Sequence, residues 1–119
     1  MPPEESDAAY LADMLIAARR IQKFTAGIRY EEFAEDEMRS LAVERAFEVI
    51  GESARLLSDD CRRAYSALPM RQMIGLRNII AHEYAEIDYR LLYRVATVDV
   101  QELIRILEDL LPDDAGIIG

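Results

Sequence analysis

The chain has 119 residues, of which 51% are hydrophobic and 31% are charged, a composition typical of one soluble globular domain. We expect residues 1–119 to form a single domain, with an ordered core over about residues 7–111 and a flexible tail over 113–119. The longest stretch without a charged residue runs from Ala64 to Met70, far short of the roughly 20 apolar residues that a membrane helix needs. The start of the chain lacks the basic and apolar regions of a signal peptide, so a cytoplasmic location is expected.

The charge is acidic overall but unevenly distributed. Fourteen basic and 23 acidic residues give a net charge of −9, which disfavours strong non-specific binding to nucleic acid. Between Arg62 and Arg94, however, six arginines stand against three acidic residues. Arginine forms bidentate contacts with phosphate, so this segment is a candidate anion site in an otherwise acidic domain.

Cysteine and histidine each occur once, as Cys61 and His82. One cysteine cannot form an internal disulfide, which fits a reducing compartment. One cysteine and one histidine cannot build a Cys/His zinc cluster within a single chain. We therefore expect no metal site, and the chemistry proposed below needs no cofactor.

The first half of the chain shows the spacing of two long helices. The first is expected to start with Ser6 as its N-cap and to stop at Gly27; its apolar stripe consists of Tyr10, Met14, Ala17, Ile21 and Phe24. A turn over Tyr30–Glu35 then leads to a second helix, with Asp36 as its expected cap. Its apolar stripe consists of Val43, Phe47, Ile50, Ala54 and Leu57. Small residues flank this stripe and allow another helix to approach closely.

The second half predicts one short and two longer helices. The short helix falls within Asp59–Ala67, and the next begins at Pro69 and extends toward Ala81. The last helix should start near Asp88 and end before Pro112; its stripe consists of Tyr93, Ala96, Val100, Leu103, Leu107 and Leu110. Strand signals are weak. We predict an all-α antiparallel bundle of four main helices with a short fifth.

The residues most suited to chemistry lie in Gly75-Leu-Arg-Asn-Ile-Ile-Ala-His-Glu-Tyr84. This segment offers a guanidinium, a carboxamide, an imidazole and a phenol, from Arg77, Asn78, His82 and Tyr84. Such a set suits metal-independent RNA cleavage, in which the 2′-hydroxyl is the internal nucleophile. Histidine can move protons near neutral pH, and a fixed arginine can stabilise charge on the phosphorus oxygens.

The same residues also have an ordinary structural interpretation. A lone histidine near a helix end is more often a capping or packing residue, and Arg77 could be a surface ion-pair residue. On an ideal helix Arg77 and His82 point about 140° apart. One histidine per chain supplies either a base or an acid, whereas a symmetric homodimer would bring two histidines to one cleft.

Several motifs together resemble one family. The segment from Arg77 to Tyr84 resembles the Arg-Asn-x3-His-x-Tyr motif of the HepT-like ribonucleases, in the HEPN superfamily. Val49-Ile-Gly-Glu-Ser-Ala54 and Tyr30-Glu-Glu-Phe-Ala-Glu-Asp36 are similar to two further family motifs. The resemblance runs from about Asp7 to Leu111. The chain departs from it at Met70 and Tyr93, where the family often has tryptophan.

The resemblance implies a HEPN-like bundle that dimerises and cleaves RNA. Arg77 and His82 would be catalytic, Asn78 would be a supporting polar residue, and the role of Glu52 stays open. The implied partner is an MntA-like minimal nucleotidyltransferase antitoxin, which would silence the toxin by adding AMP to Tyr84, with a higher assembly left open. Neither the RNA, the cleavage position nor the product ends follow from the sequence.

Two other functions compete with the ribonuclease. The first is a non-catalytic helical dimer that binds a nucleotidyltransferase partner or a nucleotide, which the acidic net charge favours. The second is a structural four-helix protein, which would leave the polar cluster of Arg77, Asn78, His82 and Tyr84 without a role.

Overall fold

The computed structural model describes residues 4–80 and 88–111, with side chains in the fifth helix described as far as Gly75. Every element in these ranges is helical, and they contain no strand, which confirms the predicted all-α class. The helices are α1 (Glu5–Thr25), α2 (Tyr30–Glu35), α3 (Glu37–Leu56), α4 (Asp59–Ala64), α5 (Met70–Ile80), α6 (Tyr89–Arg94) and α7 (Val100–Leu110), with a π-helical turn, η1 (Val95–Asp99), between the last two.

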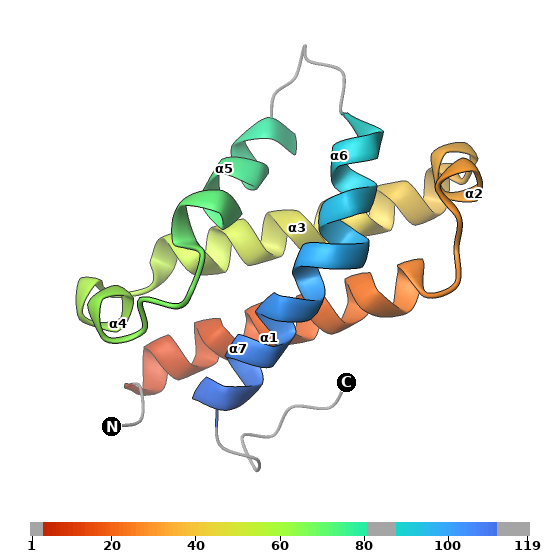
Figure 1. The fold of residues 1–119 in the computed structure, drawn as a ribbon. Helices are drawn as coiled ribbons and strands as arrows, with labels where there is room; N and C mark the ends of the chain where they lie inside the picture. Colours follow the sequence, from red (N-terminus) through yellow and green to blue (C-terminus); the bar gives the residue numbers. More distant parts are fainter. Residues whose placement is uncertain (1–3, 81–87, 112–119) are drawn as a thin grey trace.

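Figure 1 shows α6, η1 and α7 as one continuous helix, so the bundle has four main helices: α1, α3, α5 and this last one. α1 packs against both α3 and α7, α3 also packs against α5, and α2 packs against α3 and α6. The four main helices and the short α4 were predicted. The short α2 was not, because the sequence indicated only a turn over these six residues.

The core follows the predicted stripes closely. Met14, Ala17 and Ile21 of α1 are buried, and so are all five stripe residues of the second helix. α1 buries a wider face than its stripe, including Leu11, Leu15 and Ala18, because it lies between two helices. Burying apolar side chains in this way is the main source of stability for such a domain.

Side-chain caps set the starts of α3 and α6. Asp36 accepts a hydrogen bond from the backbone N–H of Arg39 at 3.0 Å, and Asp88 accepts one from that of Leu91 at 3.1 Å. Both caps were predicted. Ser6 is not a cap, because α1 already begins at Glu5 with Glu4 at the N-cap position and no side-chain cap bond. At its other end, Gly27 adopts a φ of 71°, which supports its predicted role as a stop.

The π turn shifts the buried face of the last helix. After the turn, Val100, Leu103 and Leu107 are buried as predicted. Before it, Leu92 is 1% exposed whereas the predicted stripe residue Tyr93 is only partly buried. A π turn inserts one extra residue into the helical repeat, so the stripe moves back by one position on its N-terminal side.

Candidate functional site

The fifth helix carries the first half of the polar motif. α5 starts directly after Pro69, whose fixed φ suits a helix start, and Arg77 and Asn78 belong to its last turn. The side chains of these two residues lie outside the described part of the chain. His82 and Tyr84 lie outside the described residues as well. The structure therefore locates the backbone of Arg77 and Asn78. That the four motif side chains lie close together stays a prediction.

A groove runs along the described part of α5 toward the motif. It has a volume of about 610 Å³ and lies between α5 on one side and α6, η1 and α7 on the other. Phe47 and Ile50 of α3 contribute to its lining, and its last described α5 residue is Gly75, two positions before Arg77. The volume falls in the range of ligand-binding clefts. An apolar groove thus leads to the start of the motif.

Charged groups of both signs border this groove. Arg94 lies beside Leu91 and Val95 on the α6 side, while Asp99 and Glu102 line the part nearer α7. All three charged residues are exposed. The positive charge therefore lies nearer the N-terminal end of the last helix, which directly follows residues 81–87.

An aromatic cluster fixes the start of α6. The ring of Tyr93 contacts Phe33 with centroids 5.5 Å apart and Tyr30 with centroids 5.7 Å apart, and its hydroxyl donates a hydrogen bond to the carbonyl of Ile28. Phe33 is fully buried. Tyr93 is thus a packing residue, and Met70 also packs against the core.

Two glutamates of α3, Glu52 and Glu44, differ in burial and in their hydrogen-bond partners. Glu52, whose role the sequence left open, forms an ion pair with Arg55 at 2.7 Å. Glu44 is only 7% exposed, and its Oε2 has no hydrogen-bond partner. Burial, and secondarily the nearby charge of Glu48, raises the pKa of Glu44. The burial of Glu44 was not predicted from the sequence, although its spacing from Ser40, Phe47 and Gly51 is that of a buried helix face.

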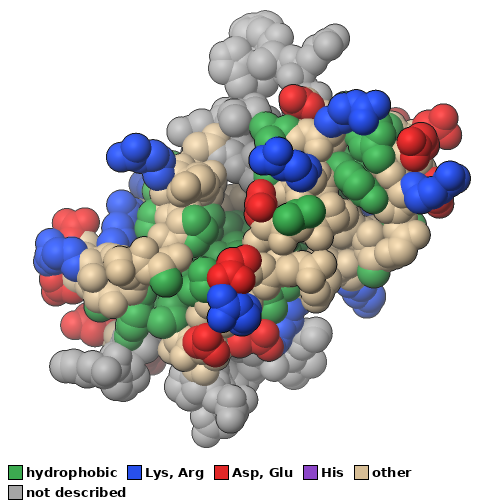
Figure 2. Space-filling model, in the orientation of Figure 1, with side chains coloured by type: hydrophobic (Ala, Val, Ile, Leu, Met, Phe, Trp, Pro, Cys, Tyr) green, Lys and Arg blue, Asp and Glu red, His purple; other side chains and the backbone are tan. Residues whose placement is uncertain are grey.

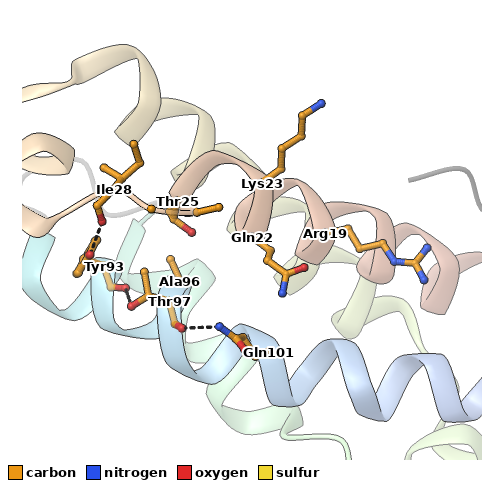
Figure 3. A pocket seen from close by; sticks show the side chains of 11 residues that line it. Arg19, Gln22, Lys23, Thr25, Ile28, Tyr93, Ala96, Thr97 and Gln101 are labelled. Carbon is orange, nitrogen blue, oxygen red and sulfur yellow. Dashed lines mark hydrogen bonds between the residues drawn. The ribbon is translucent and has the colours of Figure 1, made fainter.

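A second cavity, of about 860 Å³, lies between the C-terminal half of α1 and the π turn (Figure 3). Thr97 donates a hydrogen bond to the carbonyl of Tyr93 at 2.7 Å, and Gln101 donates one to the carbonyl of Thr97 at 3.1 Å. Figure 3 shows Lys23 pointing away from these two side chains. Among the described residues, this cavity and the groove that leads to the motif share no lining residue.

Other chemistry is limited in the described part of the chain. There, no three His, Cys, Asp or Glu side chains are grouped so that they could hold a metal ion, and no helix is long and apolar enough to cross a membrane. Cys61 is buried, and this burial raises the pKa of its thiol, which disfavours the reactive thiolate.

Comparison with known proteins identifies relatives along most of the chain. A family model described as ribonuclease HepT-like matches residues 14–110. The protein MJ1380 of Methanocaldococcus jannaschii, named as a candidate RNase, is 41% identical over 80% of this chain and 87% of its own length. MJ1216 of the same organism, also named as a candidate RNase, is 31% identical over 96% of this chain and 94% of its own.

A relative with the family's own name comes from Thermococcus cleftensis. It is named as a probable ribonuclease HepT and is 33% identical over 84% of this chain and 91% of its own length. No solved structure matches the chain. The family match runs from within α1 to the end of α7 and includes the whole polar motif. The chain therefore belongs to the HepT-like ribonuclease family.

Proposed function

We propose that the chain is the toxin of a toxin–antitoxin pair and acts as a metal-independent RNA endonuclease. The observation that carries this proposal is the intact motif of Arg77, Asn78, His82 and Tyr84 within a chain whose family match covers residues 14–110. The names of the relatives, which describe RNases, support the same activity.

The proposed reaction is attack of an RNA 2′-oxygen on the adjacent phosphorus. The bond from the 2′-oxygen to phosphorus forms while the bond from phosphorus to the 5′-oxygen breaks. His82 accepts the proton of the 2′-hydroxyl, and an acid returns a proton to the departing 5′-oxygen. Arg77 stabilises the negative charge on the phosphorus oxygens, and Asn78 orients the phosphate or the imidazole.

A homodimer is part of this proposal. One histidine cannot act as base and acid at the same instant, so the His82 of a second copy would supply the other proton transfer. Two copies of Arg77 would then share one composite cleft. The apolar groove beside the motif, with Phe47 and Ile50 in its lining, supports an arrangement in which this face of the bundle meets another molecule.

Inhibition would come from an MntA-like nucleotidyltransferase antitoxin. The hydroxyl of Tyr84 would attack the α-phosphate of ATP, forming AMP-tyrosine and releasing pyrophosphate. The added phosphate brings negative charge and bulk beside a cleft that must accept RNA phosphate. The modification would therefore block the substrate without unfolding the toxin.

Expression in a bacterial host tests the proposal. Induction of the parent should arrest growth and fragment cellular RNA, whereas His82→Ala at the same expression level should do neither. Co-expression of the nucleotidyltransferase should restore growth. Normal growth and intact RNA with the parent in the absence of any antitoxin would contradict the toxin function and favour the non-catalytic binding dimer, which the net charge of −9 also supports.

A further inference from the structure

Most of the arginines in the described part of the chain are neutralised within the protein. Seven of them form ion pairs with carboxylates, six with a residue only three positions away. They are Arg19, Arg29, Arg39, Arg45, Arg55, Arg63 and Arg105. Arg62 instead donates hydrogen bonds to the carbonyls of Ala54 and Arg55. These side chains therefore offer little positive charge to an external anion.

Apart from Arg62, four arginines with described side chains have no ion pair: Arg20, Arg71, Arg90 and Arg94. All four are exposed. Arg71 lies on α5, and Arg90 and Arg94 lie on α6, the two helices that residues 81–87 connect. Figure 2 shows blue side chains over α5 and over α6 on the face toward the viewer. Three of the unpaired positive charges thus lie on the helices beside the motif, and the exposed Arg20 and Lys23 on α1 are the exceptions.

Arg90 is held over an aromatic ring. Its Cζ lies 4.3 Å from the centroid of Tyr30, within the distance of a cation–π contact. Tyr30 in turn packs edge-on against Tyr93, whose hydroxyl is bonded to the Ile28 carbonyl. Contacts therefore connect the Ile28 carbonyl, Tyr93, Tyr30 and the guanidinium of Arg90 in series. The Tyr30 ring covers one face of this guanidinium, and Arg90 as a whole is exposed.

Arg94 lies one turn further along the same helix. Residues four apart share a helix face and are separated by about 6 Å along the axis. Arg94 also borders the groove that leads to Arg77. The pair of Arg90 and Arg94 therefore forms a line of two unpaired positive charges between the Tyr30 ring and the groove. Asp99 and Glu102 lie beyond it, so negative charge limits the line on the α7 side.

We propose that Arg90, Arg94 and Tyr30 bind the single-stranded RNA substrate, an inference that rests on the ribonuclease function proposed above. Arg94 contacts a phosphate at the entrance of the groove, as arginine does in nucleic-acid complexes. Arg90, backed by Tyr30, provides a platform on which an unpaired base stacks. A base in a duplex is already stacked on its neighbours, so this platform selects single strands.

This surface also explains how an acidic domain can bind RNA. The net charge of −9 repels the polyanion from most of the molecule, and the paired arginines do not offset that repulsion. The unpaired arginines on α5 and α6 provide a favourable approach for RNA beside the motif. The affinity for RNA should consequently be weak and dependent on salt. The bound RNA strand should lie near Arg77 and His82.

The test measures binding separately from cleavage. A fluorescent single-stranded 2′-O-methyl RNA, which lacks the nucleophilic hydroxyl, is titrated with parent, Arg90→Gln and Arg94→Gln protein. We expect each substitution to weaken binding at least about fivefold. Arg94→Gln should also flatten the dependence of the logarithm of affinity on the logarithm of salt by about 0.7, the value for one lost phosphate contact on a single strand.

Arg20→Gln is the matched control, because it removes an exposed, unpaired arginine from α1. It should bind the probe with an affinity within about twofold of the parent's, because salt screens the charge of an arginine that does not contact the RNA. Affinities of Arg90→Gln and Arg94→Gln equal to that of Arg20→Gln would overturn the inference, and so would equal affinity of the parent for single-stranded and duplex probes.

Tyr30 tests the stacking role independently. Tyr30→Phe keeps the ring and should bind like the parent, whereas Tyr30→Leu should bind at least about fivefold more weakly; thermal unfolding verifies that both variants fold. Parent protein that cleaves RNA while all these variants bind equally well would overturn the inference and leave the ribonuclease intact. Parent protein that binds the probe through Arg90 and Arg94 but never cleaves RNA would support the RNA-binding role of these residues and contradict the proposed catalysis.

Discussion

Asp7 and Ser58, 51 residues apart, join the first turn of α1 to the start of α4. The Asp7 carboxylate accepts a hydrogen bond from the backbone N–H of Ser58 at 2.9 Å and another from its hydroxyl at 2.7 Å. The Ser58 hydroxyl oxygen in turn accepts the N–H of Cys61 at 3.1 Å and so caps α4. Asp7 is only 4% exposed. One buried carboxylate thus links the first turn of α1 to the N-cap residue of α4.

Loss of this carboxylate should destabilise the fold. Asp7→Ala leaves two donors of Ser58 without their acceptor, and we expect the free energy of unfolding to fall by about 2–3 kcal/mol. Asp7→Asn keeps one acceptor oxygen and should cost less. Urea unfolding followed by circular dichroism measures the change. The exposed Asp13 on the same helix is the control; if Asp13→Ala costs as much as Asp7→Ala, the buried contact contributes nothing specific.

Two glycines should respond in opposite directions to alanine. A Cβ added at either Gly27 or Gly75 would meet no atom within 4 Å, and of the two only Gly27 has a positive φ, of 71°. Gly27→Ala should therefore lower the free energy of unfolding by about 1 kcal/mol. Gly75→Ala, inside α5, should raise it by about 0.5–1 kcal/mol because alanine favours a helix. Thermal unfolding of both variants checks the signs, and the same sign for both would refute the backbone argument.

Glu44 should make stability depend on pH. Its folded-state pKa is raised above the usual 4.5, so the folded protein holds a proton over a pH window in which the unfolded chain has lost it. Stability should fall as pH rises through that window. Glu44→Gln cannot ionise, so its stability relative to the parent should increase as pH rises above the usual 4.5. Glu37→Gln, at an exposed position of α3, is the matched control, and a gain in stability equal to that of Glu44→Gln would contradict the role of burial.

Tyr84 should be the acceptor of AMP. Parent protein incubated with the nucleotidyltransferase and ATP should gain the mass of one AMP per chain and lose RNA cleavage, while Tyr84→Phe gains no mass and stays active. Tyr89→Phe removes an exposed tyrosine five positions away and should be modified like the parent. Modification of Tyr84→Phe at the parent's rate would place the acceptor elsewhere.

Helix positions could be predicted well from the sequence because local signals determine them. The stripe through Val43, Phe47 and Ile50 and the caps Asp36 and Asp88 act within one or two helical turns, and the structure confirms them. Ser6 was misassigned because α1 begins at Glu5, with Glu4 at the N-cap position and no side-chain cap bond.

Features that depend on contacts between helices were not predicted, because no local sequence signal indicates them. The π turn at Val95–Asp99 moves Leu92 into the core without any local sequence signal. The buried Glu44 and the contact of Arg90 with Tyr30 depend on which helices become neighbours. For the site, the motif residues could be read from the sequence, and the structure adds the groove and the unpaired arginines beside them.

Cleavage of RNA by the purified protein in EDTA is the most direct test of the proposed activity. Intact mass is recorded first, to verify that Tyr84 is unmodified, and His82→Ala is assayed beside the parent, with Arg20→Gln as a variant outside the motif. We predict that the parent and Arg20→Gln cleave a cellular RNA pool without metal and that His82→Ala does not. Equal cleavage by the parent and His82→Ala, or none by an unmodified parent, would contradict the catalytic role of this motif.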